Sequence, residues 1–172
     1  MWNPGFEYLE SALAELNDHR RSFCLASIIY RGTPSAPGLV LGLEPKAGAS
    51  CRGVAFRVGK TQRDAAIAYL TKREMSNGSY TEETLPLRLS DRREVKALSY
   101  VVRTDHVQYR GGATLDEQAA VIARSHGPAG SNVEYLEQTS AALRQLGIAD
   151  EALERLLEKV RSLIGVVDDF DI

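Results

Sequence analysis

Glu74 is the carboxylate in this sequence whose predicted setting best suits proton transfer. It closes a helix predicted over residues 61–74 and comes just before the turn Ser76-Asn77-Gly78. Because the C-terminal end of a helix is its negative end, this position disfavours the carboxylate anion. A carboxylate destabilised in this way is a better proton acceptor near neutral pH, as general-base catalysis requires. Composition alone favours an ordinary surface glutamate, since the chain has 23 acidic residues.

Arg31 lies in a turn that offers a second kind of chemistry. Residues 31–38 (Arg-Gly-Thr-Pro-Ser-Ala-Pro-Gly) join two predicted strands. The glycines let the backbone approach another segment closely, and a guanidinium can bind a carboxylate through two parallel hydrogen bonds. The turn therefore predicts a carboxylate clamp built around Arg31 and Gly32, with a plain connecting turn and a solvated arginine as the alternative.

Three further places carry polar groups of interest. Residues 127–132 (Gly-Pro-Ala-Gly-Ser-Asn) open a predicted helix whose free amides can hold an anion, or form a simple loop between helices. Tyr80 and Tyr135 offer hydroxyls to a ligand, although tyrosines more often serve in packing. The start, Trp2-Asn3-Pro4-Gly5, is typical of a polar turn. No Ser/His/Asp or Cys/His arrangement and no phosphate-binding glycine motif is recognisable, so the sequence does not support a serine or cysteine nucleophile.

The elements that position these residues follow an order of strands first and helices later. Short apolar runs bounded by Gly and Pro predict strands at residues 21–30, 38–43, 51–58, 81–89 and 95–102. Helices are predicted over 61–74, capped by Thr61, and over 114–126, 131–146 and 150–164, with Ser131 as a cap and Gly127 and Gly147 as stop signals. Residues 6–16 fit either a helix or a strand. This order predicts an α+β fold with a mixed or antiparallel sheet.

Bulk properties narrow the class of protein. The 172 residues, 44% apolar and 26% charged, suit one folded domain spanning residues 1–172. The net charge of −2, with scattered arginines, argues against a nucleic-acid partner, and no apolar stretch is long enough to span a membrane. Cys24 and Cys51 lie in apolar, strand-like runs, which favours free thiols and a cytoplasmic location. Neither they nor the three histidines have the spacing of metal ligands, so we expect no metal.

Several motifs, in this order along the chain, resemble the signature of the ChaC-type γ-glutamylcyclotransferases. They are residues 1–6 (MWNPGF), 19–24 (HRRSFC), 30–34 (YRGTP), 37–40 (PGLV), 51–55 (CRGVA), 69–74 (YLTKRE) and 127–136 (GPAGSNVEYL). The similarity extends from residue 1 to about residue 160, and several independent motifs in the right order make chance similarity improbable.

The resemblance implies a small mixed, β-barrel-like sheet with flanking helices, and a lyase that cleaves glutathione to 5-oxoproline and cysteinylglycine without a cofactor or metal. The α-amine of the γ-glutamyl unit would attack its own side-chain carbonyl, so that positioning the bent substrate supplies much of the rate. By resemblance the catalytic base is Glu74. The substrate-binding residues expected beside it are Trp2, Asn3, Arg31, Gly32, Tyr80, Asn132 and Tyr135.

The sequence departs from the family at its beginning. The family's first strand ends in a Tyr-Gly-Ser-Leu turn immediately before the segment that matches Met1-Trp2, and that turn is absent here. The resemblance therefore predicts that a first strand is missing and that the natural start lies upstream. The strand edge left exposed would favour pairing with a second copy of the chain as a homodimer.

Two other functions stay open from the sequence. One is a non-catalytic binding or regulatory protein, of the cation-transport-regulator type, that keeps the fold without turnover. The other is an enzyme acting on γ-glutamyl compounds other than glutathione. The turn around Arg31 favours glutathione over other γ-glutamyl substrates, and it does so only through its resemblance to the family.

Overall fold

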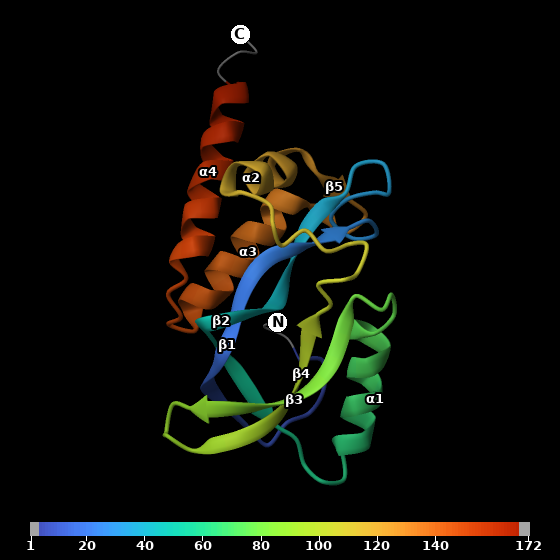
Figure 1. The fold of residues 1–172 in the computed structure, drawn as a ribbon, viewed down its shortest axis with the longest axis vertical. Helices are drawn as coiled ribbons and strands as arrows, with labels where there is room; N and C mark the ends of the chain where they lie inside the picture. The colour runs from blue at the N-terminus through green and yellow to red at the C-terminus, as the bar shows by residue number, and fades with distance from the viewer. Residues whose placement is uncertain (1–3, 169–172) are drawn as a thin grey trace. The chain divides into compact units, whose positions relative to one another are not determined.

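The computed structural model describes residues 4–168 and has strands in its first part and helices in its last (Figure 1). The elements are β1 (Glu10–Ser27), β2 (Gly38–Arg57), α1 (Arg63–Glu74), β3 (Tyr80–Leu89), β4 (Glu94–Val102), α2 (Leu115–Arg124), β5 (His126–Gly127), β6 (Gly130–Ser131), α3 (Asn132–Gln145) and α4 (Glu151–Asp168). The α+β class predicted from the order of elements is confirmed.

The main sheet has four strands in the order β2-β1-β3-β4. β3 pairs antiparallel with β4 along nearly its whole length, from Tyr80 opposite Val102 to Arg88 opposite Glu94, and pairs antiparallel with β1 near Ala14. In the described part of the chain β2 and β4 are the outer strands, so the sheet is open. The expectation of a barrel-like sheet was therefore wrong, while a strand ahead of Met1 lies outside the described residues and stays a prediction.

Two strands are longer than the sequence predicted. β1 begins at Glu10, so residues 10–16 of the ambiguous segment 6–16 are strand and residues 6–9 belong to neither a strand nor a helix. Leu9, part of the apparent helical spacing, is 68% exposed. β2 joins the two strands predicted at 38–43 and 51–58 into one of 20 residues. Pro45 and Gly48 between them suggest a break, but β1 runs alongside, and the Gly48 N–H donates to Asp18 Oδ1 at 2.8 Å. Pairing with a neighbour thus outweighs the local signal.

The described residues divide into two compact units. The hairpin unit comprises the residues up to Arg21 and Leu43–His106, and the helical unit comprises Ser22–Gly42 and the residues from Val107 onward. β1 and β2 therefore each contribute residues to both units. The expectation of one domain over residues 1–172 stays a prediction.

The hairpin unit is built on the antiparallel pair β3 and β4, with α1 beside it (Figure 1). Thr71 of α1 donates a hydrogen bond to Glu82 of β3 at 3.2 Å, which joins the helix to the hairpin. α1 buries only Ala66. The helix therefore lies on the unit with most of its surface exposed, and its C-terminal end carries Glu74.

The helical unit holds a larger apolar core. α2 contacts both α3 and α4. Residues 23–27 of β1 are all buried, as expected of a strand covered on both faces. The buried apolar side chains of this unit are Phe23, Cys24, Leu25, Ala26, Leu39, Ala119, Ile122, Leu136, Leu143, Ile148, Leu153, Leu156, Leu157 and Val160.

The helix ends confirm some of the capping predictions and correct others. The Ser131 hydroxyl accepts from the Glu134 N–H at 3.0 Å, so Ser131 caps α3 as predicted. Gly147 follows the end of α3 with φ +67°, the left-handed conformation of a helix stop. Thr61 does not cap α1: the residue at that position is Gln62, and no side chain there accepts from the helix. Within residues 4–168, every helix is too short or too polar to cross a lipid bilayer.

Candidate active site

Glu74 is the last residue of α1, as predicted, and its side chain is 17% exposed. Its Oε1 atom accepts a hydrogen bond from Nε of Arg73 at 2.8 Å. The helix ends there because the chain turns at Met75, whose N–H still reaches the Thr71 carbonyl at 2.9 Å. The proposed base thus has a cation beside it, a neighbour that the helix-end argument left out.

Arg73 contacts more than Glu74. Its Nη1 atom donates to the Pro4 carbonyl at 3.1 Å and to the Tyr69 hydroxyl at 3.2 Å, and its guanidinium carbon lies 5.2 Å from the centre of the Tyr69 ring. Burial lowers the pKa of Arg73, but its hydrogen bonds with Tyr69 and Glu74 outweigh burial and leave that pKa raised. Arg73 therefore stays a cation at every physiological pH.

A second carboxylate, Glu82, lies near the end of α1. Its Oε2 atom accepts from the hydroxyls of Thr71 and Tyr100, each at 3.2 Å. Glu82 and Tyr100 are directly opposite each other on β3 and β4. Burial raises the pKa of Tyr100, and the negative charges of Glu82 and Glu74 add to that rise. Tyr100 therefore stays protonated and is able to donate at neutral pH.

Three further residues predicted to belong to the site are Tyr80, Trp2 and Asn3. Tyr80 begins β3, opposite Val102, and is partly exposed. Trp2 and Asn3 lie outside the described residues. The hairpin unit thus holds Glu74 and Tyr80 among the described candidates.

Arg31 belongs to the helical unit and is well fixed there. Its side chain is 14% exposed, and Nη1 donates to the Ser131 carbonyl and to Glu134 Oε2, each at 3.2 Å. The guanidinium carbon also lies 5.4 Å from the centre of the Tyr135 ring. A carboxylate therefore already sits at the guanidinium predicted to bind one.

Glycines make the turn around Arg31 tight. A Cβ atom on Gly32 would overlap the backbone nitrogen of Gly38 and lie 2.5 Å from the Ser27 carbonyl oxygen. A Cβ on Gly127 would overlap the Tyr30 carbonyl and lie 2.5 Å from the backbone nitrogen of Gly32. Only glycine permits this approach of three backbone segments.

Asn132 and Tyr135 both face this turn from α3. Asn132 is fully buried; its Oδ1 accepts from the Leu39 N–H at 2.6 Å and its Nδ2 donates to the Leu39 carbonyl at 2.7 Å. Tyr135 packs the edge of its ring against Phe23, with 5.8 Å between the ring centres, and its hydroxyl accepts from the Leu41 N–H at 3.4 Å. Both polar atoms of the Asn132 side chain are therefore hydrogen-bonded to the protein backbone.

The segment expected to present free amides, residues 127–132, forms the short antiparallel pair β5 and β6 before α3 begins. The Ala129 N–H donates to the Tyr30 carbonyl at 2.9 Å, and the Asn132 N–H to the Ser125 carbonyl at 2.9 Å. The Ala129 amide thus holds the segment against the residue before the Arg31 turn, and the Asn132 amide is bonded to the end of α2 rather than left free for an anion.

The structure brings Arg31, Gly32, Asn132 and Tyr135 together in the helical unit. Sequence reasoning missed Glu134, the carboxylate that pairs with Arg31. It also missed the contact of Arg73 with Tyr69, although a spacing of four residues on a helix was available as a signal, because such residues share a face.

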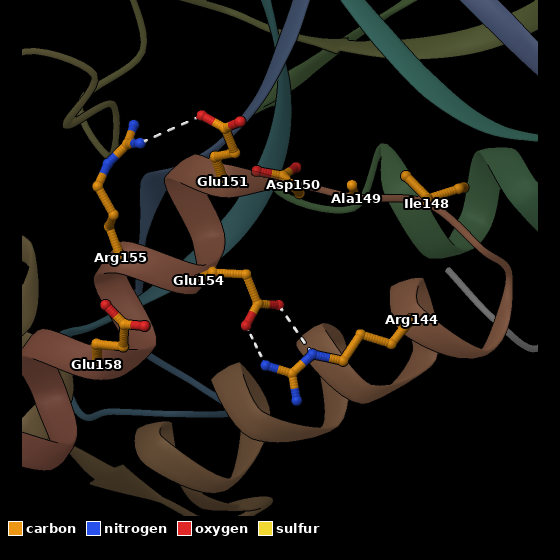
Figure 2. A pocket seen from close by; sticks show the side chains of 8 residues that line it. All are labelled: Arg144, Ile148, Ala149, Asp150, Glu151, Glu154, Arg155 and Glu158. Carbon is orange, nitrogen blue, oxygen red and sulfur yellow. Dashed lines mark hydrogen bonds and ion pairs between the residues drawn. The ribbon is translucent and has the colours of Figure 1, made fainter.

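A surface hollow of about 490 Å³ lies where α3 leads into α4 (Figure 2). Its lining residues are Arg144, Ile148, Ala149, Asp150, Glu151, Glu154, Arg155 and Glu158. Arg144 forms an ion pair with Glu154, and Arg155 one with Glu151. None of the predicted site residues is among them. Within residues 4–168, no three His, Cys, Asp or Glu side chains are grouped so that they could hold a metal ion.

Solved structures with this fold include some that are named γ-glutamyl cyclotransferases. The crystal structure of the γ-glutamyl cyclotransferase specific to glutathione from yeast matches with a TM-score of 0.80 and 27% identity, over 90% of this chain and 89% of that one. A more distant structure, a γ-glutamyl cyclotransferase 15% identical with a TM-score of 0.53, shares the fold alone. The fold is therefore that of the γ-glutamylcyclotransferases.

The sequence comparisons narrow this class to one family. The ChaC-like protein family matches residues 1–163. The glutathione-specific γ-glutamylcyclotransferase of Escherichia coli is 35% identical over 165 residues, which cover 96% of this chain and 71% of that protein. γ-Glutamylcyclotransferase 2-1 of Arabidopsis thaliana is 32% identical over 98% of this chain and 82% of its own length. The chain belongs to the ChaC-like protein family, as its motifs predicted.

Proposed function

We propose that the protein is a glutathione-specific γ-glutamylcyclotransferase, a lyase that converts glutathione to 5-oxoproline and cysteinylglycine. Relatives from a bacterium and from vertebrates bear the name glutathione-specific γ-glutamylcyclotransferase, a plant relative bears the name γ-glutamylcyclotransferase, and the yeast enzyme specific to glutathione shares the fold. Membership of the family over residues 1–163 supports the same assignment.

The reaction closes a ring and releases an amine. The α-amine nitrogen of the γ-glutamyl unit attacks the γ-carbonyl carbon, forming the lactam C–N bond, and the bond from that carbon to the cysteinyl nitrogen breaks. A proton leaves the attacking amine, and one returns to the departing nitrogen. No atom changes oxidation state and no water is consumed, so a base, an acid and a well-positioned substrate suffice.

Glu74 is the proposed base, and one observation carries the assignment. Its carboxylate is largely shielded from solvent, at 17% exposure, and is held by a charged hydrogen bond from Arg73 at the end of α1. Such a carboxylate accepts the amine proton and, once protonated, donates it to the departing nitrogen. Tyr80, Trp2 and Asn3 remain proposed substrate-binding residues.

Arg31 is the proposed group that binds a carboxylate of glutathione. Its guanidinium already holds Glu134 through a single nitrogen, and the guanidinium carbon lies over the Tyr135 ring. Gly32 permits the tight turn that carries it, and Asn132 acts by fixing Leu39 rather than by touching the substrate. We expect Arg31→Lys to raise KM for glutathione, because an ammonium lacks the planar fork.

The test is to incubate the purified protein with glutathione and to quantify 5-oxoproline and cysteinylglycine. We expect the two products in equal amounts, and much slower turnover of γ-glutamyl amino acids that lack the cysteinylglycine part. Absence of product would contradict the proposal. Glutathione binding by calorimetry without product would support the non-catalytic alternative instead.

The proposal places the protein in the cytoplasm with glutathione as its small-molecule partner, and without nucleic-acid or membrane partners. Cys24 and Cys51 are not joined in a disulfide, and such reduced cysteines suit a reducing compartment. A second copy of the chain is the proposed protein partner, pairing through an outer strand of the described sheet. Light scattering tests this: a dimer is expected, and a monomer at all concentrations would contradict it.

A further inference from the structure

Arg73 holds the carboxylate of Glu74 from a position that is itself fixed on several sides. The planar guanidinium donates through Nε to Glu74 at 2.8 Å and through Nη1 to Tyr69 and to the Pro4 carbonyl. The Tyr69 ring, 5.2 Å from the guanidinium carbon, contacts its face. A guanidinium bound at two of its nitrogens and along one face has little freedom to rotate.

The spacing on α1 explains this arrangement. Tyr69 and Arg73 are four residues apart, so they lie one above the other on the same face of the helix. Glu74 is the next residue and projects from another direction around the helix axis. The Arg73 guanidinium can therefore bond to Glu74 only if its Nε edge turns toward that carboxylate. The contacts of Arg73 with Tyr69 and the Pro4 carbonyl hold it in this orientation.

Residues 4–8, which precede β1, are themselves held in place by contacts with β2. Phe6 and Tyr8 both pack edge-on against Phe56 of β2, with ring centres 6.1 and 5.0 Å apart. The Leu9 N–H donates to the Arg57 carbonyl at 2.7 Å. These contacts anchor the backbone that presents the Pro4 carbonyl to Arg73.

Gly5 allows this segment to lie against α1. It has φ +75°, and a Cβ atom there would overlap the Tyr69 hydroxyl. A larger residue would push the Pro4 carbonyl away from Arg73. Contacts therefore run without interruption from β2 through residues 4–8 to Arg73 and Glu74.

We propose that Arg73 is a positioning residue for the catalytic base: anchored by Tyr69 and the Pro4 carbonyl, it fixes the orientation of the Glu74 carboxylate and keeps a cation beside it. This rests on the proposed function, in which Glu74 accepts the proton of the substrate amine. Lysine cannot replace arginine here, because an ammonium has no planar fork with which to contact three partners at once.

The experiment compares Arg73→Met, Arg73→Lys and Tyr69→Phe with the unmodified enzyme, measuring kcat and KM with glutathione and the melting temperature of each protein. In Arg73→Met we expect kcat to fall up to about 100-fold, since a misplaced catalytic group loses this much. KM should stay within about twofold, because binding of the ground state is untouched. Tyr69→Phe, which removes a single hydroxyl, should show a smaller fall in kcat.

The split between kcat and KM, together with the melting temperature, separates positioning from general loss of structure. In both Arg73→Met and Arg73→Lys we expect kcat to fall, while KM and the melting temperature stay close to those of the unmodified enzyme. Lys72→Met is the matched control: this exposed cation is the adjacent residue of the same helix, and its removal should change neither kcat nor KM.

Four outcomes would overturn the inference. They are an unchanged kcat in Arg73→Met, a raised KM with normal kcat, which would make Arg73 a substrate-binding residue, a lowered kcat in Lys72→Met, or a lowered kcat in Arg73→Met that is accompanied by a reduced melting temperature. Glu74→Gln is assayed alongside. If it stays active, the assignment of Glu74 as the base fails and this inference with it; if it is inactive, the Arg73 variants alone decide the inference. Absence of product with the unmodified protein would instead contradict the proposed function.

Discussion

The side-chain amide of Asn132 is hydrogen-bonded to both backbone groups of Leu39, at 2.6 Å to the N–H and 2.7 Å to the carbonyl oxygen. These residues are 93 positions apart in the chain, and both are buried. The amide thereby ties the first turn of α3 to the beginning of β2. Within the helical unit this connection holds α3, which carries Tyr135, beside the turn that carries Arg31.

Asn132→Ala should lower the free energy of unfolding by about 1–3 kcal/mol for each of the two Leu39 groups left buried without a partner. Chemical denaturation followed by circular dichroism measures the change. Gln138→Ala, an exposed amide on the same helix, is the control and should change stability by less than about 0.5 kcal/mol. Equal effects of the two substitutions would show that the Asn132 amide does not stabilise this connection.

Gly32→Ala should destabilise the helical unit by about 1–3 kcal/mol, because the added methyl group meets backbone atoms of Gly38 and Ser27 that cannot rotate away. KM for glutathione should rise as well if the turn presents Arg31 to the substrate. Gly53→Ala is the matched control, since no atom lies within 4 Å of a Cβ at that position in β2. A Gly32→Ala protein as stable as the Gly53→Ala protein would contradict the tight approach.

Glu154 gives a prediction about pH. A hydrogen bond from Arg144, then one from Ser140, lowers the pKa of Glu154 below its usual 4.5. A lowered folded-state pKa contributes stability that is present above the unfolded-state pKa and is lost as the pH falls through the folded-state pKa. Glu154→Gln should therefore be less stable than the unmodified protein near pH 7, and the difference should narrow at about pH 3.

Denaturation curves at the two pH values test this, with Glu158→Gln as the control that removes the same charge from an exposed position on α4. The control should show little difference at either pH. A stability difference for Glu154→Gln that is independent of pH would contradict the role of its ionised carboxylate.

Local signals in the sequence were enough to predict the order of helices and strands and the residue at which α1 ends. The helix pattern placed Glu74 at its observed terminus, and Ser131 proved to be a cap. These features depend on residues close together in the chain, where propensity and capping act directly.

What the sequence could not provide depends on contacts between distant residues. Pro45 and Gly48 favour a break between two strands, yet pairing with β1 makes β2 one continuous strand. The open sheet in place of a barrel is likewise a property of strand order, which no local pattern encodes. Glu134 joins Arg31 across 103 positions, so only the folded chain reveals the pair.

The proposed role of Glu74 as the catalytic base is tested most directly by the rate at which Glu74→Gln forms 5-oxoproline from glutathione. Glutamine keeps the size of the side chain but cannot take up a proton, so we expect the rate to fall by about 100-fold or more with an unchanged circular dichroism spectrum. A Glu74→Gln protein that turns over glutathione at the unmodified rate would contradict the assignment of Glu74 as the base.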